Sequence, residues 1–392
     1  MTILDLLRKE WLDLKRDRRI LLTSILLPLL LLPLIGVIIY ASVSSQPPTV
    51  MIVNNSTGNL PYVNYLKDYV VQHGGIVYIN NFSVVADVEV IFPPNFSSNL
   101  TSLDRVAYVQ EKVLISSQSN AQTLVNNALY NILVNDSLAR ITVLEKGSHI
   151  NVSPNVVREP LEVYLGYYKP TKQATSSNVD RLGQLARVVS LILFPAATPV
   201  IFFLTDGILG EKERKTLESL LASPVSPMEF IISKLSISMI LGIISSLGDL
   251  MGLIAFSVFA PFIIGGNAGV TLSFSATVIA AYLLMILLTA SISLILLIFI
   301  GGTQRNVQII NFLITGFGML ASFSALILNF ASLGSLSFIL VIPYVQIVAG
   351  LLDSVFGLTF YTMGLFIGTF VVSVALILIS SRVLNPERIL LK

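Results

Sequence analysis

The feature that most constrains this chain is a long stretch almost without charge. From residue 235 to residue 381 the sequence carries only three charged side chains, those of Asp249, Arg305 and Asp353. Because a helix that crosses a bilayer needs about 20 apolar residues, this stretch has room for several spans. Only 12% of the whole chain is charged, against about 25% in soluble proteins. The sequence therefore predicts an integral membrane protein and excludes a soluble enzyme, a disordered chain and a nucleic-acid binder.

Six apolar segments have the length of a membrane span, so the predicted fold is an α-helical polytopic membrane protein with six transmembrane helices. The first span is expected at 20–43, where two prolines are tolerable in a membrane helix. The other five spans form a transmembrane region at about 187–392. They are expected at 185–206, 230–258, 272–300, 307–329 and 358–380. The apolar segment 331–356 is broken by Gly334, Pro343 and Gly350, which favours a re-entrant outer hairpin.

The first 19 residues have the pattern of an amphipathic helix. Leu4, Leu7, Trp11 and Leu14 recur at helical spacing, and six lysines and arginines supply the polar side. We expect a cytoplasmic helix in the membrane interface, with its tryptophan among the headgroups. A plain charged tail is the alternative. A cleaved signal peptide fits less well, because the charged region is too long and the following apolar run has span length.

Residues 44–186 have ordinary polarity and alternate between strand and helix signals, which predicts an inserted extracellular α/β domain. Helices are expected at 61–72, closed by His73-Gly74-Gly75, and at 118–140. The polar segment 170–180 is expected to be a linker. The expected strands are 49–53, 76–79, 88–92, 106–109, 113–115 and 141–144.

Loop charges predict the orientation. Segment 1–19 carries six lysines and arginines and segment 207–234 carries four, whereas 259–271 and 330–357 carry none. Because positive charge is retained on the cytoplasmic side, we expect a multi-pass protein of the plasma membrane with both termini cytoplasmic.

Seven asparagines begin a glycosylation sequon, and all lie within 44–186, the segment expected outside the cell. The alternative is a set of asparagine-rich loops that carry no sugar. These candidate sites are Asn54, Asn55, Asn81, Asn95, Asn99, Asn135 and Asn151.

The sequence offers no catalytic or metal-binding set. It has no cysteine and only two histidines, His73 and His149, so we expect no metal site. Asp249 lies alone inside the third expected span, where an acid is costly and a functional candidate. A hydrogen bond between helices, proton or cation coupling, and substrate contact all remain open for it. Asp353 is expected to be solvated near the outer mouth.

The loop 207–229 holds the most informative motif, GEKERKTLESLLASPVSPME from Gly210 to Glu229. Its leucines form an apolar strip on a short helix, predicted at 211–223, among charged residues. Ser226-Pro227-Met228-Glu229 is a capping box with proline at the first helical position, and it starts the third span. Such a helix suits docking to a soluble partner, although a solvated helix without a partner has the same pattern.

This loop resembles the first cytoplasmic loop of ABC type-2 permeases, the membrane subunits of one class of ABC exporter. The shared features are the Gly-Glu start, the Thr-Leu-Glu core, the paired leucines and the closing Ser-Pro, and Lys215 stands where glycine is usual. The segment 88–100, VEVIFPPNFSSNL, is similar to the strand, Pro-Pro and helix of the family's outer domain. Residues 113–133 resemble the strand and helix that follow it.

The resemblance implies a permease without a cofactor of its own. No phosphate-binding loop motif occurs in the chain, so ATP and Mg would be held by a separate cytoplasmic ABC ATPase. The permease would form a homodimer or pair with a similar permease in the lipid bilayer, and export substrate. The alternatives are a secondary ion-coupled transporter that uses Asp249 and a non-transporting surface receptor. Docking to the ATPase would use Glu211, Glu213, Arg214, Leu217, Leu220 and Leu221.

Overall fold

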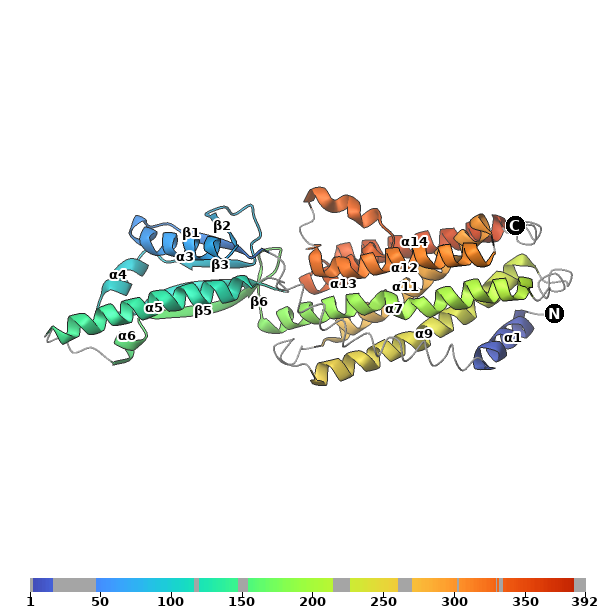
Figure 1. Cartoon of the computed structure of the whole chain (residues 1–392), viewed down its shortest axis with the longest axis horizontal. Coiled ribbons are helices and arrows are strands. Elements are labelled where there is room, and N and C mark those ends of the chain that lie inside the picture. The colour runs from blue at the N-terminus through green and yellow to red at the C-terminus, as the bar shows by residue number, and fades with distance from the viewer. Residues whose placement is uncertain are drawn as a thin grey trace. The chain divides into compact units, whose positions relative to one another are not determined.

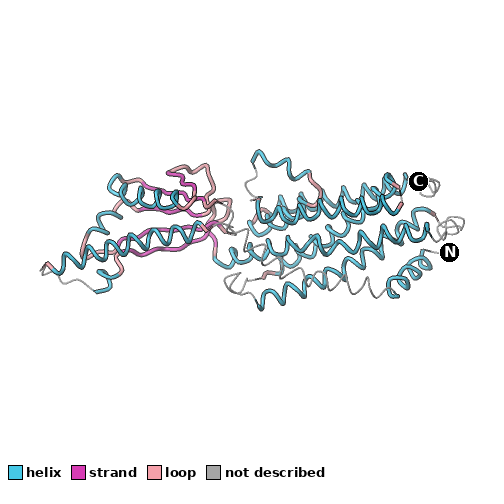
Figure 2. Tube along the Cα trace, in the orientation of Figure 1, coloured by secondary structure: helices cyan, strands magenta, loops and turns pink. Residues whose placement is uncertain are grey.

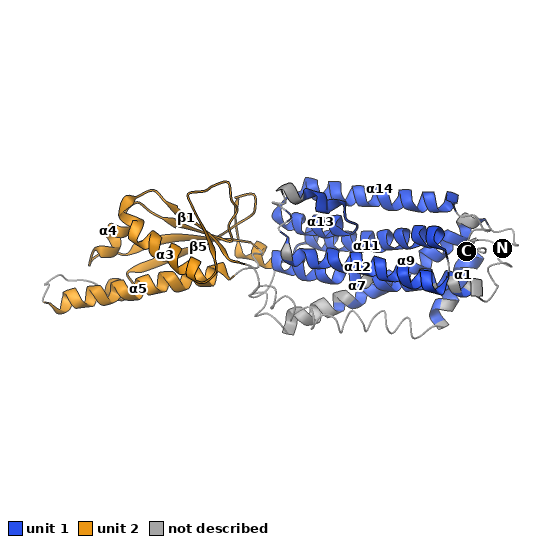
Figure 3. Ribbon diagram, turned by 45° about the horizontal axis from the view of Figure 1, so that its top comes forward, with its two compact units in different colours: residues 1–38, 182–392 blue, residues 39–181 orange. Residues whose placement is uncertain are grey.

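The computed structural model of the chain describes residues 3–16, 47–115, 120–146, 154–213, 226–259, 270–301, 303–328, 330 and 334–383. The chain divides into two compact units, which Figure 3 colours separately. One unit is Ile39–Arg181, and the other combines Met1–Ile38 with Leu182–Lys392. Figures 1 and 2 show that the first holds the strands and the second consists of helices.

The unit Ile39–Arg181 contains a mixed six-stranded sheet of order β2-β1-β3-β4-β5-β6. Strand β1 is parallel to both β2 and β3, β4 is antiparallel to β3 and parallel to β5, and β6 is antiparallel to β5. The strands are β1 (Thr49–Asn54), β2 (Ile76–Ile79), β3 (Val88–Phe92), β4 (Ala107–Leu114), β5 (Leu161–Tyr168) and β6 (Ala174–Thr175). The helical elements are η1 (Thr57–Asn59), α3 (Leu60–Gln72), α4 (Phe96–Thr101), α5 (Ala121–Glu145) and α6 (Pro154–Arg158).

The core of this unit follows from the two-residue period of its strands, which sends alternate side chains to opposite faces. On β4, Ala107, Val109 and Val113 are buried in one cluster with the inward sides of α3 and α5, so these helices cover a single face of the sheet. The other face is more open, with Tyr108 and Tyr164 both exposed and their rings 5.4 Å apart.

Local strand signals misled the sequence prediction at several places in this unit. The expected strands 106–109 and 113–115 form one continuous strand, β4. The expected strand 141–144 is wrong, because these residues, three of which are β-branched, belong to the last turns of α5. Strand β5 was not expected, and its pairing with β4 over eight residues is a long-range contact that no local pattern reveals.

The end of α3 agrees with the sequence. His73 follows the helix and its Nδ1 lies 2.7 Å from the carbonyl oxygen of Tyr69. Gly74 then adopts a φ of 80°, the left-handed conformation that ends many helices and favours glycine.

Among the described residues, the helical unit has five helices long and apolar enough to cross a membrane, so the polytopic fold is supported. The first expected span, 20–43, lies outside the described residues. The candidate spans are Ser177–Thr205, Glu229–Gly248, Leu272–Ile300, Gln304–Leu326 and Thr359–Val383. The elements themselves are α1 (Ile3–Arg16), α7 (Ser177–Glu213), α9 (Pro227–Phe259), α11 (Leu272–Ile300), α12 (Gln304–Ile327), η3 (Gly334–Val341), α13 (Val345–Phe356) and α14 (Thr359–Val383).

Helix α7 is longer than its predicted span at both ends. It begins at Ser177, inside the segment expected to be a linker, and passes through Pro195 and Pro199. Since Pro199 has no N–H, it leaves the carbonyl of Pro195 without its helical partner, and the Thr198 hydroxyl donates to that oxygen at 2.7 Å. The helix therefore continues through both prolines.

The segment expected as a re-entrant hairpin, 331–356, contains the 3-10 helix η3 and the short helix α13. Tyr344 joins them with a φ of 75°, which is uncommon for a residue other than glycine. The Tyr344 ring is buried against the ring of Phe194 on α7, with centroids 5.2 Å apart. An aromatic contact from another helix thus supports the strained turn.

The Phe194 ring also lies against the backbone of α12 at Gly318, where a Cβ atom would come within 2.0 Å of the ring. We expect Gly318→Ala to lower stability by about 1–3 kcal/mol, because Phe194 must move and its contact with Tyr344 changes. Gly316→Ala is the matched control, since no atom lies within 4 Å of its added methyl. Thermal unfolding of the detergent-solubilised chain measures both, and equal melting temperatures would contradict this account of the packing.

Candidate functional site

The docking residues predicted from the sequence lie at and beyond the end of α7. Glu211 and Glu213 are in its last turn, so residues 211–213 continue α7 and no new helix begins at 211. Nothing between Leu209 and Glu213 stops a helix strongly enough, because a single glycine costs only about 1 kcal/mol. Arg214, Leu217, Leu220 and Leu221 lie outside the described residues.

The other end of the loop is held by the expected capping box. The Ser226 amide and hydroxyl donate to Glu229 Oε2 at 2.9 and 3.0 Å, and the Glu229 amide donates back to the Ser226 hydroxyl at 3.2 Å. This reciprocal bonding satisfies free N–H groups at the start of α9. The prediction of this cap is confirmed, and it places the beginning of α9 directly after the loop.

About two turns beyond the cap at Ser226, a buried ion pair joins α9 to the N-terminal helix. Lys234 Nζ donates to Glu10 Oε2 at 2.8 Å, and the two side chains are only 5% and 2% exposed. Lys9 lies 3.4 Å from the other oxygen of Glu10. Removing one member of a buried pair is strongly destabilising, because it leaves an uncompensated charge.

An apolar cluster extends the same contact. Leu14 of α1 is buried with Phe203 of α7 and with Ile237 and Leu241 of α9, and Leu7 packs against them. On α7, a Cβ atom at Gly207 would lie 3.5 Å from Lys234 Nζ. Helix α1 therefore packs where α7 and α9, the two helices that flank the loop, come together.

Sequence reasoning missed the Glu10–Lys234 pair, although two signals were present. Lys234 is the last charge before the uncharged stretch, and Glu10 is an acid in a basic, amphipathic segment. The residues of the predicted apolar strip of α1 also do not share one environment in the structure. Leu14 faces the protein, whereas Leu4 and Trp11 are 72% and 44% exposed.

Two polar contacts tie α7 to α12 inside the helical unit. The buried Arg187 guanidinium donates to the carbonyl oxygen of Ala325. Nearer the loop, the Thr205 hydroxyl lies 3.1 Å from Asn311 Oδ1 and donates to the Ile201 carbonyl at 2.7 Å. These contacts join α7 and α12 at two levels, so α7 is held to a neighbouring span along much of its apolar length.

The two acids singled out from the sequence have different outcomes. Asp249 lies on α9, but its side chain is outside the described residues, so its role stays a prediction. The expectation that Asp353 is solvated is wrong: it is buried on α13, and its Oδ1 has no hydrogen-bond partner among the described residues. Helix α13 packs against α11, α12 and α14, and the sequence alone does not show this packing.

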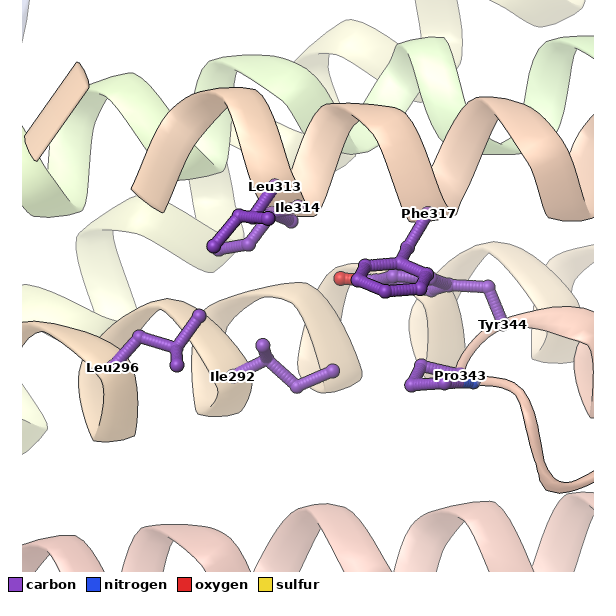
Figure 4. Close-up of a pocket in the computed structure, with 7 residues that line it drawn as sticks. All are labelled: Ile292, Leu296, Leu313, Ile314, Phe317, Pro343 and Tyr344. Atoms are coloured by element: carbon purple, nitrogen blue, oxygen red, sulfur yellow. The ribbon is translucent and has the colours of Figure 1, made fainter. Parts of the chain in front are cut away.

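An apolar pocket of about 220 Å³ lies between α11, α12 and the turn at Tyr344. Figure 4 shows its lining, which consists of Ile292, Leu296, Leu313, Ile314, Phe317, Pro343 and Tyr344. Such a lining suits an acyl chain or another apolar group, and it offers few groups that could orient a hydrophilic substrate.

Six of the seven sequons lie within the described residues, and the exposure of their asparagines differs. Asn55, Asn81, Asn95 and Asn135 are exposed, whereas Asn54 and Asn99 are partly buried. At Asn81, Oδ1 accepts from the amide and hydroxyl of Ser83, and Nδ2 takes no part in these two bonds. The Asn54 amide instead donates to the Ser56 carbonyl at 2.9 Å. Asn151 lies outside the described residues.

No group of three or more histidine, aspartate or glutamate side chains suited to a metal ion occurs among the described residues. The sequence profile described as ABC-2 family transporter protein matches residues 18–382, which is nearly the whole chain. No curated protein and no solved structure matches the chain.

Proposed function

The chain belongs to the ABC-2 family of transporter proteins, and from this membership we propose that it is the permease subunit of an ATP-driven exporter. The energy comes from ATP and Mg bound by a separate cytoplasmic ABC ATPase, and the chain itself performs no catalysis. Two permeases, identical or similar, form the pathway with two ATPases. The family match over 18–382 is the observation that carries this proposal.

The geometry around the loop supports a mechanical role. Helix α7 ends at Glu213 and α9 begins at Pro227, so each of the two flanking helices includes one end of the motif Gly210–Glu229. A force that the ATPase exerts on a docking element between them is therefore transmitted directly to two membrane helices. Because α7 is bonded to α12 and packed on Tyr344, its displacement also moves neighbouring spans.

The sequence charges support an orientation in which this loop and both termini are cytoplasmic, in the plasma membrane. The α/β unit is then extracellular, and its exposed sequons, Asn81 above all, are the candidates for glycosylation. In this arrangement the unit faces the side on which the exported substrate is released.

The experiment replaces Leu217 and Leu220 together by alanine. We expect weaker co-purification with the ATPase and lower transport, because truncating a buried interface anchor typically costs about 2 kcal/mol or more. Membrane insertion should be unchanged, since both residues lie outside every expected span. Lys215→Gly is the matched control and should be nearly silent. Undiminished assembly and ATP turnover in the double variant would refute this loop as the coupling element.

A further inference from the structure

Helix α1 has two opposite faces of different character. The buried face consists of Leu6, Glu10 and Leu14, spaced by four residues. The other face carries Leu4, Arg8, Trp11 and Lys15, all exposed and spaced as one narrow helical stripe. Neither Arg8 nor Lys15 forms a hydrogen bond or ion pair with any described residue. We call these four residues the α1 stripe.

The composition of the α1 stripe specifies its surroundings. Leu4 and Trp11 are too apolar for contact with water alone, and Arg8 and Lys15 are too costly to place in hydrocarbon. Both requirements are met in the headgroup layer, where an indole sits at the boundary and long cationic side chains reach the phosphates. Because Arg8 and Lys15 form no ion pair with any described residue, their charges complement a negatively charged surface.

The buried face of the same helix contacts the two helices that flank the coupling loop. Glu10 is paired with Lys234, about two turns after the cap that ends the loop, and Leu14 packs with residues of both α7 and α9. A change in the position of α1 is therefore transmitted to the bases of both helices that flank the loop.

We propose that the α1 stripe binds anionic phospholipid headgroups of the membrane, and that the Glu10–Lys234 pair transmits this binding to the coupling loop. The binding step is independent of the ATPase, whereas the transmission step rests on the proposed function. Anionic lipid then acts as a regulator: it holds α1 in the position that supports coupling, and its depletion lowers turnover.

Trp11 is the only tryptophan in the chain, so its fluorescence reports on this stripe alone. The full chain is reconstituted into vesicles that contain phosphatidylcholine and phosphatidylglycerol in a fixed ratio. Two samples are compared: in one the phosphatidylcholine is brominated, and in the other the phosphatidylglycerol is brominated, so that the bromine quenches tryptophan fluorescence nearby. We expect stronger quenching when phosphatidylglycerol carries the bromine. High salt should reduce the difference, and added glycerol phosphate should not abolish it.

Arg8→Gln with Lys15→Gln should weaken the preference for phosphatidylglycerol on the order of tenfold, since each cation near an anionic surface contributes separately. Lys67→Gln with Arg158→Gln removes the same charge from exposed positions of the α/β unit and should keep the preference. Equal quenching by the two brominated lipids in the unaltered chain overturns the binding step.

The transmission step is tested in the complex with the ATPase. Replacing phosphatidylglycerol by phosphatidylcholine should lower ATP turnover severalfold in the unaltered chain. Glu10→Gln should abolish this lipid response while Trp11 still prefers phosphatidylglycerol, and the exchange Glu10→Lys with Lys234→Glu should restore it. A full lipid response in Glu10→Gln overturns transmission through the pair. Failure to bind the ATPase at all counts against the proposed function and leaves the Trp11 result standing.

Discussion

Replacing Arg140 by methionine should destabilise the α/β unit by about 3–5 kcal/mol. Arg140 is a buried residue of α5. Its guanidinium donates hydrogen bonds to five acceptors. Methionine fills a similar volume but leaves these acceptors without a donor, and each buried unpaired group costs about 1–3 kcal/mol. The acceptors are Asp136 Oδ2 at 2.9 Å and the carbonyl oxygens of Arg105 (2.9 Å), Val156 (2.8 Å), Asn99 (3.2 Å) and Leu100 (2.7 Å).

Asp136 limits the loss. Burial raises the pKa of its carboxyl, and the nearby Arg140 guanidinium opposes that rise. Without the guanidinium the carboxyl takes up a proton more readily, which avoids a bare buried charge. The remaining cost therefore comes mainly from the carbonyl oxygens.

Native-state hydrogen exchange of the β4 amides in the full chain measures this effect. Lys112→Met is the control, because Lys112 is partly exposed and its ion pair with Glu89 spans 3.8 Å. A pair of this kind contributes about 0–1 kcal/mol. If Arg140→Met changed exchange no more than Lys112→Met does, the five bonds would not hold the unit together.

A second large effect is expected at Glu111, as a dependence of stability on pH. Glu111 lies on β4 between Val109 and Val113, on the face covered by helices, and is 1% exposed. Its Oε1 has no hydrogen-bond partner among the described residues. Desolvation raises the pKa of this carboxyl from 4.5 to about 7.

The direction of this pH dependence follows from the number of protons bound by the folded and the unfolded chain. Between pH 4.5 and about 7 the folded unit holds a proton on Glu111 that the unfolded chain has released. Stability therefore falls as pH rises through this window, by about 1.4 kcal/mol per pH unit, and levels off above it. The whole loss is on the order of 3 kcal/mol.

Glu111→Gln should remove this slope and make the unit more stable than the unaltered one above neutral pH. Glu162→Gln, at an exposed position on the neighbouring strand β5, should leave the slope in place. Hydrogen exchange of the β4 amides over a series of pH values compares the three chains. A slope that survives in Glu111→Gln would assign the pH dependence to another group.

Much of the helical unit was readable from the sequence, because a membrane span is specified locally by length and hydropathy. Five expected spans correspond to α7, α9, α11, α12 and α14. The cap at Ser226 and the close of α3 at Gly74 were readable for a similar reason, since each depends on residues within a few positions.

The tertiary structure decided what depends on residues far apart in the chain. Glu10 and Lys234 are 224 positions apart, and neither has a local pattern that requires a partner. The sequence predicted a solvated Asp353, but the helix that carries it packs against three others and its side chain is buried. The sequence also predicted a strand at 141–144, but α5 continues through these residues. A local pattern sets the preference of a segment, but burial and pairing are set by which other segments pack against it, and only the folded chain brings those together.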